Sequence, residues 1–248
     1  MPPQHSQIHS RVQVDNSGRV NILKILVLNG SPKKNSDTFR LTEAFLKGLN
    51  KNRSHDLNVI NVIEKSIAPC TGCFECWKQT EGHCVIEDDH NEILDLYKNA
   101  ELIIWSFPLY CFSMPSHLKA FLDRTIPLLK MKMIQESDGS VHHESLVDFS
   151  KKHTLVICGC GFPDWDGNFD ALRIMCKVCF RDPDMVCVPE TPLLNVPEAA
   201  IIADPLLLRF EMAGEEYDAS MTLSEETISE LQMPMMPKEE YIRHVNGL

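Results

Sequence analysis

The sequence predicts an α/β fold built on a doubly wound parallel sheet. Short apolar runs alternate with segments whose apolar residues recur at the period of a helix, which is typical of strand–helix–strand units. The first run, Ile25–Leu28, is apolar throughout, as expected of a strand buried on both faces. The 248 residues are enough for one such domain with additions.

Five strands and their helices can be placed in order. The first strand, its loop and its helix occupy 24–50, and the later strands are expected at 57–62, 102–105, 154–158 and 186–188. Helices are expected at 90–99, from Ser113 to Pro127, at 168–180, at 206–221, at 224–231 and after Pro237. Residues 131–150 are expected to form a polar connection. Five strands suit the flavodoxin-like order 2-1-3-4-5.

The chain divides into three parts without a second domain. Residues 1–23 are polar and form an N-terminal arm, either disordered or with a small hairpin around Asp15–Gly18. Residues 24–190 carry the strand–helix alternation. Residues 191–248 lose that alternation and are expected to be a C-terminal helical extension of the same domain.

Charge and cysteine content exclude several functional classes. The formal net charge of −11 argues against nucleic acid or an anionic membrane as partner. No apolar run reaches the length of a membrane span, and the first ten residues lack the apolar core of a signal peptide. Ten cysteines without an export signal indicate a reducing compartment, and hence a cytoplasmic protein with free thiols or metal ligands.

The loop after the first strand has the features of a phosphate site. A buried strand turns at Asn29-Gly30 into the polar loop SPKKNSDT and then into a helix, whose N-terminal amides and dipole favour an anion. The loop has neither the three glycines of a dinucleotide fingerprint nor a Gly-Lys-Ser/Thr sequence, so a terminal monophosphate such as that of FMN suits it better. An ordinary helix start capped by Ser36 or Asp37 is the alternative.

Two further loops follow strands at the same edge of the predicted sheet. The segment Pro108–Phe112 is apolar and aromatic where loops are usually polar, which suits the wall of a flat ring such as isoalloxazine. Phe107, Tyr110 and Phe112 are equally compatible with a place in the core. The glycines in Gly159-Cys160-Gly161 allow close approach to a ligand or form a plain turn.

Together these motifs resemble the flavodoxin-fold NAD(P)H-dependent FMN reductase family, and within it the iron–sulfur flavoproteins and their relatives. The similarity covers about residues 24–190 and is carried, in the family's order, by NGSPKKNSDT, GCFECW with GHCVIEDD, WSFPLYCFSMPSHLKAFLDR and CGCGFPDWDGNFDAL. The resemblance implies non-covalent FMN. It implies a phosphate loop formed by Ser31, Lys33, Asn35, Ser36 and Thr38. It implies a ring loop formed by Pro108, Leu109, Tyr110 and Phe112, with Cys111 between them, and a second ring edge formed by Gly159, Cys160, Gly161 and Phe162.

A cysteine motif lies between the second strand and the next helix. Cys70, Cys73, Cys76 and Cys84 have the spacing C-x2-C-x2-C-x7-C, which is compatible with a 4Fe–4S cluster, and the resemblance makes them candidate ligands. Four thiolates also suit zinc. Redox-active thiols and purely structural cysteines are the other interpretations. We expect this loop to lie at the flavin edge of the sheet.

The resemblance implies an NAD(P)H-dependent FMN reductase that passes a hydride from the nicotinamide to FMN and electrons on to an acceptor. The acceptor is a small molecule or a protein, and a homo-oligomer is expected. One alternative is an electron carrier that uses FMN and a 4Fe–4S cluster. Another is a flavin-free binding module. No acid or base is assigned, because the cofactor carries the chemistry.

Overall fold

The expected parallel sheet is present in the structure, a computed structural model that describes residues 22–247. The five strands lie in the order β2-β1-β3-β6-β7 and all pair in parallel, which is the predicted 2-1-3-4-5 order. They are β1 Lys24–Asn29, β2 Asp56–Asn61, β3 Leu102–Pro108, β6 His153–Gly159 and β7 Asp184–Val188. The predicted N-terminal arm lies outside the described residues, except for its last two positions.

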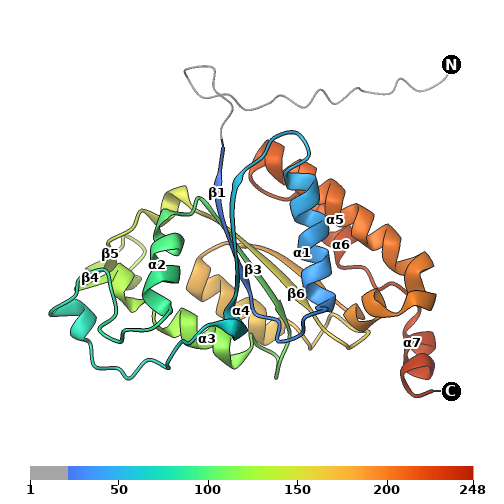
Figure 1. The fold of residues 1–248 in the computed structure, drawn as a ribbon, viewed down its shortest axis with the longest axis horizontal. Coiled ribbons are helices and arrows are strands. Elements are labelled where there is room, and N and C mark those ends of the chain that lie inside the picture. Colours follow the sequence, from blue (N-terminus) through green and yellow to red (C-terminus); the bar gives the residue numbers. More distant parts are fainter. Residues whose placement is uncertain (1–21, 248) are drawn as a thin grey trace.

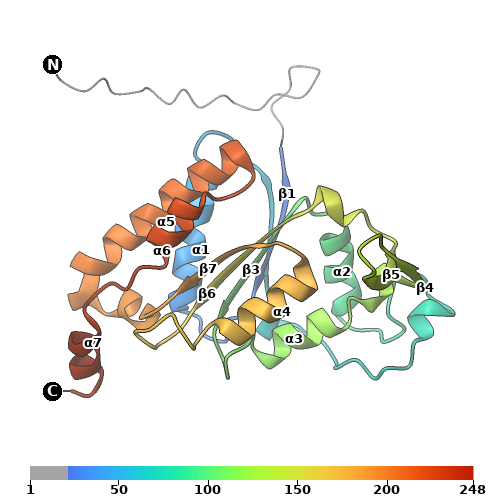
Figure 2. The ribbon, with the colours of Figure 1, turned by 180° about the vertical axis from the view of Figure 1, so that it is seen from behind.

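Helices cover both faces of the sheet. Figures 1 and 2 show α1 and α5 on one face and α2, α3 and α4 on the other. The helices are α1 Asp37–Leu49, α2 His90–Asn99, α3 Ser116–Asp123, α4 Asp170–Phe180, α5 Ala200–Ser220, α6 Glu225–Leu231 and α7 Lys238–Val245.

Alternate residues of the central strands pack into two separate cores, one on each face of the sheet. In β1, Ile25 and Val27 pack under α1 and α5, whereas Leu26 and Leu28 pack under α2, α3 and α4. This is why the strand is apolar throughout and not alternating. Because both faces of these central strands are filled, their carboxyl ends are fixed relative to one another.

Four cysteines belong to the second core. Cys158, Cys160, Cys176 and Cys187 are buried there. Burial raises the pKa of the Cys160 thiol to about 11 and that of Cys176 to about 12. These thiols therefore stay protonated at neutral pH and act as small apolar residues.

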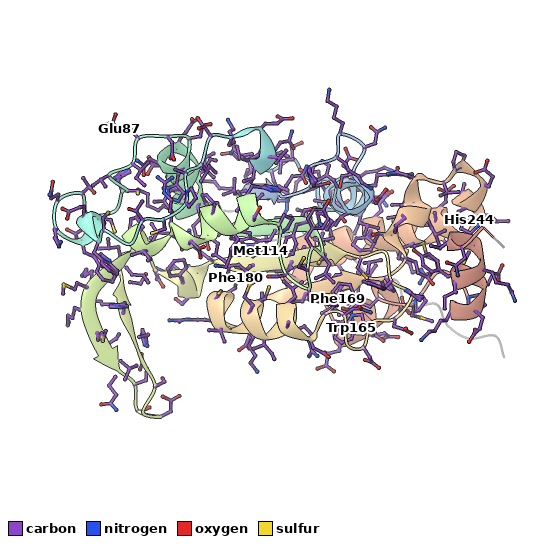
Figure 3. All side chains as sticks on the ribbon, turned by 90° about the horizontal axis from the view of Figure 1, so that it is seen from below. Glu87, Met114, Trp165, Phe169, Phe180 and His244 are labelled. Carbon is purple, nitrogen blue, oxygen red and sulfur yellow. The ribbon has the colours of Figure 1, made fainter. Side chains whose placement is uncertain are left out.

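Residues 131–150 are not a polar connection, so that prediction was wrong. They contribute most of an antiparallel hairpin, β4 Leu129–Gln135 and β5 Val141–Ser145, which projects from the body of the molecule in Figure 3. The turn lies at Gly139, whose φ is +88°, and Ser140 N donates to Asp138 Oδ1 at 2.9 Å. The Asp-Gly sequence after alternating apolar and charged residues is the signal that favours this hairpin.

Helix α5, from the predicted C-terminal extension, is part of the main core. It crosses α1 so closely that a Cβ on Gly48 would overlap the carbonyl oxygen of Glu211, and a Cβ on Gly214 would overlap that of Phe45. Phe210 and Tyr217 of α5 are fully buried against the sheet face. Two glycines thus set the distance between these helices.

Gly214→Ala should lower the free energy of unfolding by about 1–3 kcal/mol, because the helices must separate to admit the methyl group. Helix propensity alone predicts the opposite sign, a gain of about 1 kcal/mol. Urea unfolding of the variant beside the wild type distinguishes the two. An unchanged or increased stability would contradict the close crossing.

Candidate functional site

Four segments meet at the carboxyl edge of the sheet around a cavity of about 130 Å³. Figure 3 looks onto this edge. The predicted site residues that line the cavity are Ser31, Lys33, Ser36, Thr38, Pro108, Leu109, Tyr110, Gly159, Cys160 and Gly161. Asn35, Cys111, Phe112 and Phe162 belong to the same loops but do not line it. Sequence reasoning missed Asp37, Thr191 and Pro192, which also line the cavity.

The loop before α1 presents unused hydrogen-bond donors. Ser36 is the N-cap, and its Oγ accepts from Phe39 N at 3.0 Å. The backbone amides of residues 34–38 make no hydrogen bond within the described residues. Free amides at a helix N-terminus, with the hydroxyls of Ser31 and Thr38 beside them, form a donor set that fits a phosphate.

The charge at this loop is balanced within the protein. Lys33 Nζ lies 3.1 Å from Asp37 Oδ2, so the one lysine that lines the cavity is already paired. Asn195 Nδ2 donates to the same carboxylate and, at 3.1 Å, to the carbonyl of Asn35. Anion binding here therefore rests on amides, hydroxyls and the helix dipole more than on a free cation.

The aromatic loop contains a strained turn. Tyr110 and Ser113 exchange two backbone hydrogen bonds of 2.9 and 3.0 Å, and Cys111 and Phe112 between them both have positive φ, +47° and +62°. This is a type I′ turn, which normally has Asn or Gly at the central positions. Non-glycine residues held in this region are costly and gather at functional sites.

The turn holds two aromatic side chains out of the core. Tyr110 and Phe112 are 45% and 48% exposed, while Phe107, just before them, is fully buried. Phe162, from the loop after β6, is also about half exposed. The core interpretation therefore holds for Phe107 only, and the other three rings are accessible at the edge where ligands bind in this fold.

Gly159 brings three segments into contact. A Cβ at this position would lie 2.6 Å from Thr191 Cγ2 and 2.7 Å from Thr38 Oγ1. Gly161 differs, because a Cβ there would only reach Pro192, at an ordinary 3.6 Å. Packing within the chain requires the first glycine but not the second, so Gly161 leaves space on the cavity side.

The segment after β7 is a fifth one at the carboxyl edge, beyond the four loops that the sequence motifs indicate. Thr191 and Pro192 follow the fifth strand, and the same topological rule that selects the other loops selects this one. Thr191 N and Oγ1 donate to the carbonyl of Cys160 at 2.9 and 3.1 Å. No local signal in the sequence marks Asn195.

The four cysteines of the motif line a second, smaller cavity. Cys70, Cys73, Cys76 and Cys84 surround about 30 Å³ together with Arg124. Burial and the neighbouring thiols raise the pKa of Cys76, whereas hydrogen bonds from the amide of Glu75 and from Thr71 lower that of Cys73.

Arg124 anchors this loop. Its side chain is fully buried and donates to the carbonyls of Ala68 and Ile86, each at 3.1 Å, and to Asp88 Oδ2 at 2.5 Å. A cation thus lies among the thiols.

The motif gathers four thiols without forming a coordination site. In residues 22–247 no group of three or more His, Cys, Asp or Glu side chains is arranged to hold a metal ion. The cavity lined by these cysteines shares no lining residue with the larger cavity, and the expectation that their loop lies at the flavin edge stays a prediction.

Comparisons with known proteins agree with the fold. The sequence model of the flavodoxin-like fold family matches residues 23–172. An iron–sulfur flavoprotein of Methanosarcina thermophila is 33% identical over 110 residues, 44% of this chain and 56% of that protein. One from Archaeoglobus fulgidus is 30% identical over 105 residues, 42% and 46% of the two chains. The chain spans about half the length of the curated relatives it matches.

Solved structures show the same architecture. An FMN-dependent NADH-azoreductase from Bacillus anthracis in complex with FMN superposes with a TM-score of 0.55 at 19% identity, covering 78% of this chain and 98% of that one. An NAD(P)H:quinone oxidoreductase from Methanothermobacter marburgensis gives a TM-score of 0.57 at 18% identity, covering 79% of this chain and 96% of that one.

Across the part of the chain that the structure describes, no helix is long and apolar enough to cross a bilayer.

The two glycines of the loop after β6 should respond differently to the same substitution. Gly159→Ala forces its methyl group against two β-branched side chains and should lower the free energy of unfolding by about 1–3 kcal/mol. Gly161→Ala should leave it within about 0.5 kcal/mol of wild type. Equal losses in thermal or urea unfolding would show that Gly159 is not the point of contact.

Proposed function

The chain belongs to the flavodoxin-like fold family, and from this premise we propose that it is an FMN-dependent oxidoreductase that takes electrons from NADH or NADPH. The observation that carries the proposal is the single cavity formed by the loop before α1, the loop after β3 and the loop after β6. These loops lie on one edge of the sheet, where this fold binds its ligands. The names of the relatives and of the structural neighbours also support the proposal.

The phosphate of FMN is assigned to the loop before α1. The amides of residues 34–38 and the hydroxyls of Ser31, Ser36 and Thr38 would hold it, with Asn35 and Lys33 at its rim. A charged acceptor makes each such hydrogen bond worth about 1.5–3 kcal/mol. A neutral donor set of this kind suits one phosphate group better than a longer anion.

The isoalloxazine ring is assigned to the space between the other two loops. A cavity of about 130 Å³ is smaller than the roughly 300–1,000 Å³ typical of sites that enclose a whole ligand. The ring would therefore lie outside it, against Tyr110 and Phe112 on one side and Gly161 and Phe162 on the other. Such a ring stays open to a second molecule.

The protein's own residues bind and orient, while FMN supplies the chemistry. When bound, FMN accepts a hydride from a reduced nicotinamide and releases electrons to an acceptor. The half-exposed rings of Tyr110, Phe112 and Phe162 leave the approach open to the donor and the acceptor in turn. We assign no side chain as acid or base.

The acceptor is a small molecule or a protein in this proposal. The net charge of −11 disfavours nucleic acid and anionic membranes. We propose a homo-oligomer in the cytoplasm, on the strength of the family resemblance and the free thiols.

A second candidate is an electron carrier in which the cysteine motif holds a 4Fe–4S cluster beside FMN. The observation that favours it is the gathering of four thiols around one cavity that Arg124 also lines. The relatives named iron–sulfur flavoproteins support it. The phosphate and ring loops form their cavity without any residue of the cysteine motif, so we rank this candidate second.

Replacing Ser36 and Thr38 by Ala should weaken FMN binding at least tenfold, because two donors to a charged acceptor are lost. Fluorescence titration of apoprotein with FMN measures this. Ser224→Ala is the matched control. Ser224 is the N-cap of α6, and its Oγ accepts from Thr227 N at 3.2 Å as Ser36 Oγ accepts from Phe39 N, but it lies away from the cavity. It should lose similar stability and keep FMN affinity. Unchanged affinity in the double variant would remove the phosphate assignment.

Cys73→Ser separates the two candidates. For the reductase, wild-type protein purified without air contains no stoichiometric iron, and the variant keeps its rate of nicotinamide oxidation. For the carrier, the variant loses iron and acid-labile sulfide together and retains FMN, whose contacts come from other loops. Cys179→Ser, an exposed cysteine on α4, is the control for losing a thiol. Stoichiometric iron and sulfide in the wild type would reverse our ranking.

A further inference from the structure

The loop after β6 is held from behind by the C-terminal part of the chain. Tyr241, on α7, donates from its hydroxyl to the carbonyl of Gly161 at 2.8 Å. Its ring is buried in a small apolar cluster with Leu193 and Ala199. Burial raises the pKa of Tyr241 to about 12, so at neutral pH the hydroxyl keeps the proton that it donates.

Two further contacts fasten the same loop. Lys238 Nζ, at the start of α7, lies 2.6 Å from Asp164 Oδ2. Gln232 Oε1 accepts from Trp165 Nε1 at 3.3 Å and from Cys187 N, on the edge strand β7, at 3.0 Å. Figure 3 shows Trp165 in the loop that precedes α4, on the side of α4 toward the C-terminal helix. We refer to residues 232–241 as the C-terminal brace.

Glu190 joins the brace to the cavity from the other side. Its Oε2 accepts from Met235 N at 2.7 Å and Met236 N at 3.1 Å, and its own amide donates to the carbonyl of Phe162 at 3.0 Å. The next residue, Thr191, lines the cavity. One side chain and its backbone therefore link the brace, the segment after β7 and the loop after β6.

Despite these hydrogen bonds, the surroundings of Glu190 are unfavourable for a carboxylate. Glu190 is fully buried, its Oε1 has no hydrogen-bond partner among the described residues, and its φ is +57°. Burying an incompletely paired carboxylate is costly, and a left-handed backbone would suit Gly or Asn better. Retained strain of this kind is typical of positions that a functional site depends on.

The bond to Tyr241 also fixes a peptide plane. In a trans peptide the C=O and the following N–H point in opposite directions, so holding the carbonyl of Gly161 on Tyr241 directs the amide of Phe162 away from the brace. That amide makes no hydrogen bond in the described part of the chain. It is available to an acceptor on a bound ligand.

We propose that the C-terminal brace is part of the flavin site and that Tyr241 and Glu190 are positioning residues, which orient the Gly161–Phe162 peptide toward the edge of the isoalloxazine ring. The inference rests on the proposed FMN function. All of these residues but those of the loop itself lie beyond the stretch, 23–172, that matches the family. The brace would therefore adapt a shared fold to this chain's own flavin environment.

Comparing FMN with riboflavin tests the brace, because the two share the ring and differ in the phosphate. Tyr241→Phe should raise the dissociation constants of both by the same factor, about fivefold, since one hydrogen bond behind the ring edge is lost. The flavin absorption maximum and midpoint potential should shift as well. Glu190→Gln, which keeps the shape of the side chain, should also shift the midpoint potential.

Two controls separate a local from a general effect. Tyr217→Phe removes an equally buried hydroxyl near the C-terminal end of α5, beside Asp184 at the start of β7 and away from the carboxyl edge, and should leave flavin affinity, spectrum and potential unchanged. Ser36→Ala should weaken FMN and spare riboflavin. If wild-type protein binds FMN but Tyr241→Phe keeps its affinity, spectrum and potential, the brace is not part of the site. If wild-type protein binds no FMN, the proposed function itself fails.

Discussion

The contact at Gly159 is the constraint on which the site depends. Thr38 begins the buried face of α1 and Thr191 follows the edge strand β7, and both side chains reach the backbone at the end of β6. A side chain at residue 159 would push these segments apart. The donors before α1 and the loop after β6 are therefore held at a separation that the sheet alone, which fixes only the strands, would not determine.

The two cores explain how the sheet supplies a rigid base for this contact. Central strands with both faces buried leave little freedom to slide, and the close crossing of α1 with α5 fixes the helix that carries the anion-binding amides. Disturbance at the glycines of that crossing reaches the site through the position of α1. The part of the chain beyond the family match therefore contributes to the scaffold as well as to the loops.

Much of the fold was predictable because it follows from period and topology. Apolar runs such as Ile25–Leu28 identify buried strands, and the parallel order then places their loops on one edge. The cavity joins residues from the segments after four of the five strands, β1, β3, β6 and β7. The hairpin of β4 and β5 was not predicted, because strands were identified by apolar residues that face a core. Met131 and Met133 of this hairpin are exposed, and they alternate with charged residues.

Other features of the site could not be predicted because they are long-range contacts of ordinary residues. Asn195, Gln232 and Tyr241 act through side-chain hydrogen bonds to segments far away in the sequence. Nothing in their local sequence distinguishes them from surface residues of a helical tail. The strained turn at Cys111 and Phe112 is likewise invisible, since neither residue type predicts a positive φ.

An absorption spectrum of protein purified without air, recorded before and after addition of NADH or NADPH, tests the central claim most directly. An FMN-dependent oxidoreductase shows flavin bands near roughly 375 and 450 nm that bleach when the nicotinamide is added. Apoprotein that has lost its flavin regains these bands with FMN. A colourless protein that takes up no FMN, or a bound flavin that neither nicotinamide reduces, would contradict the account.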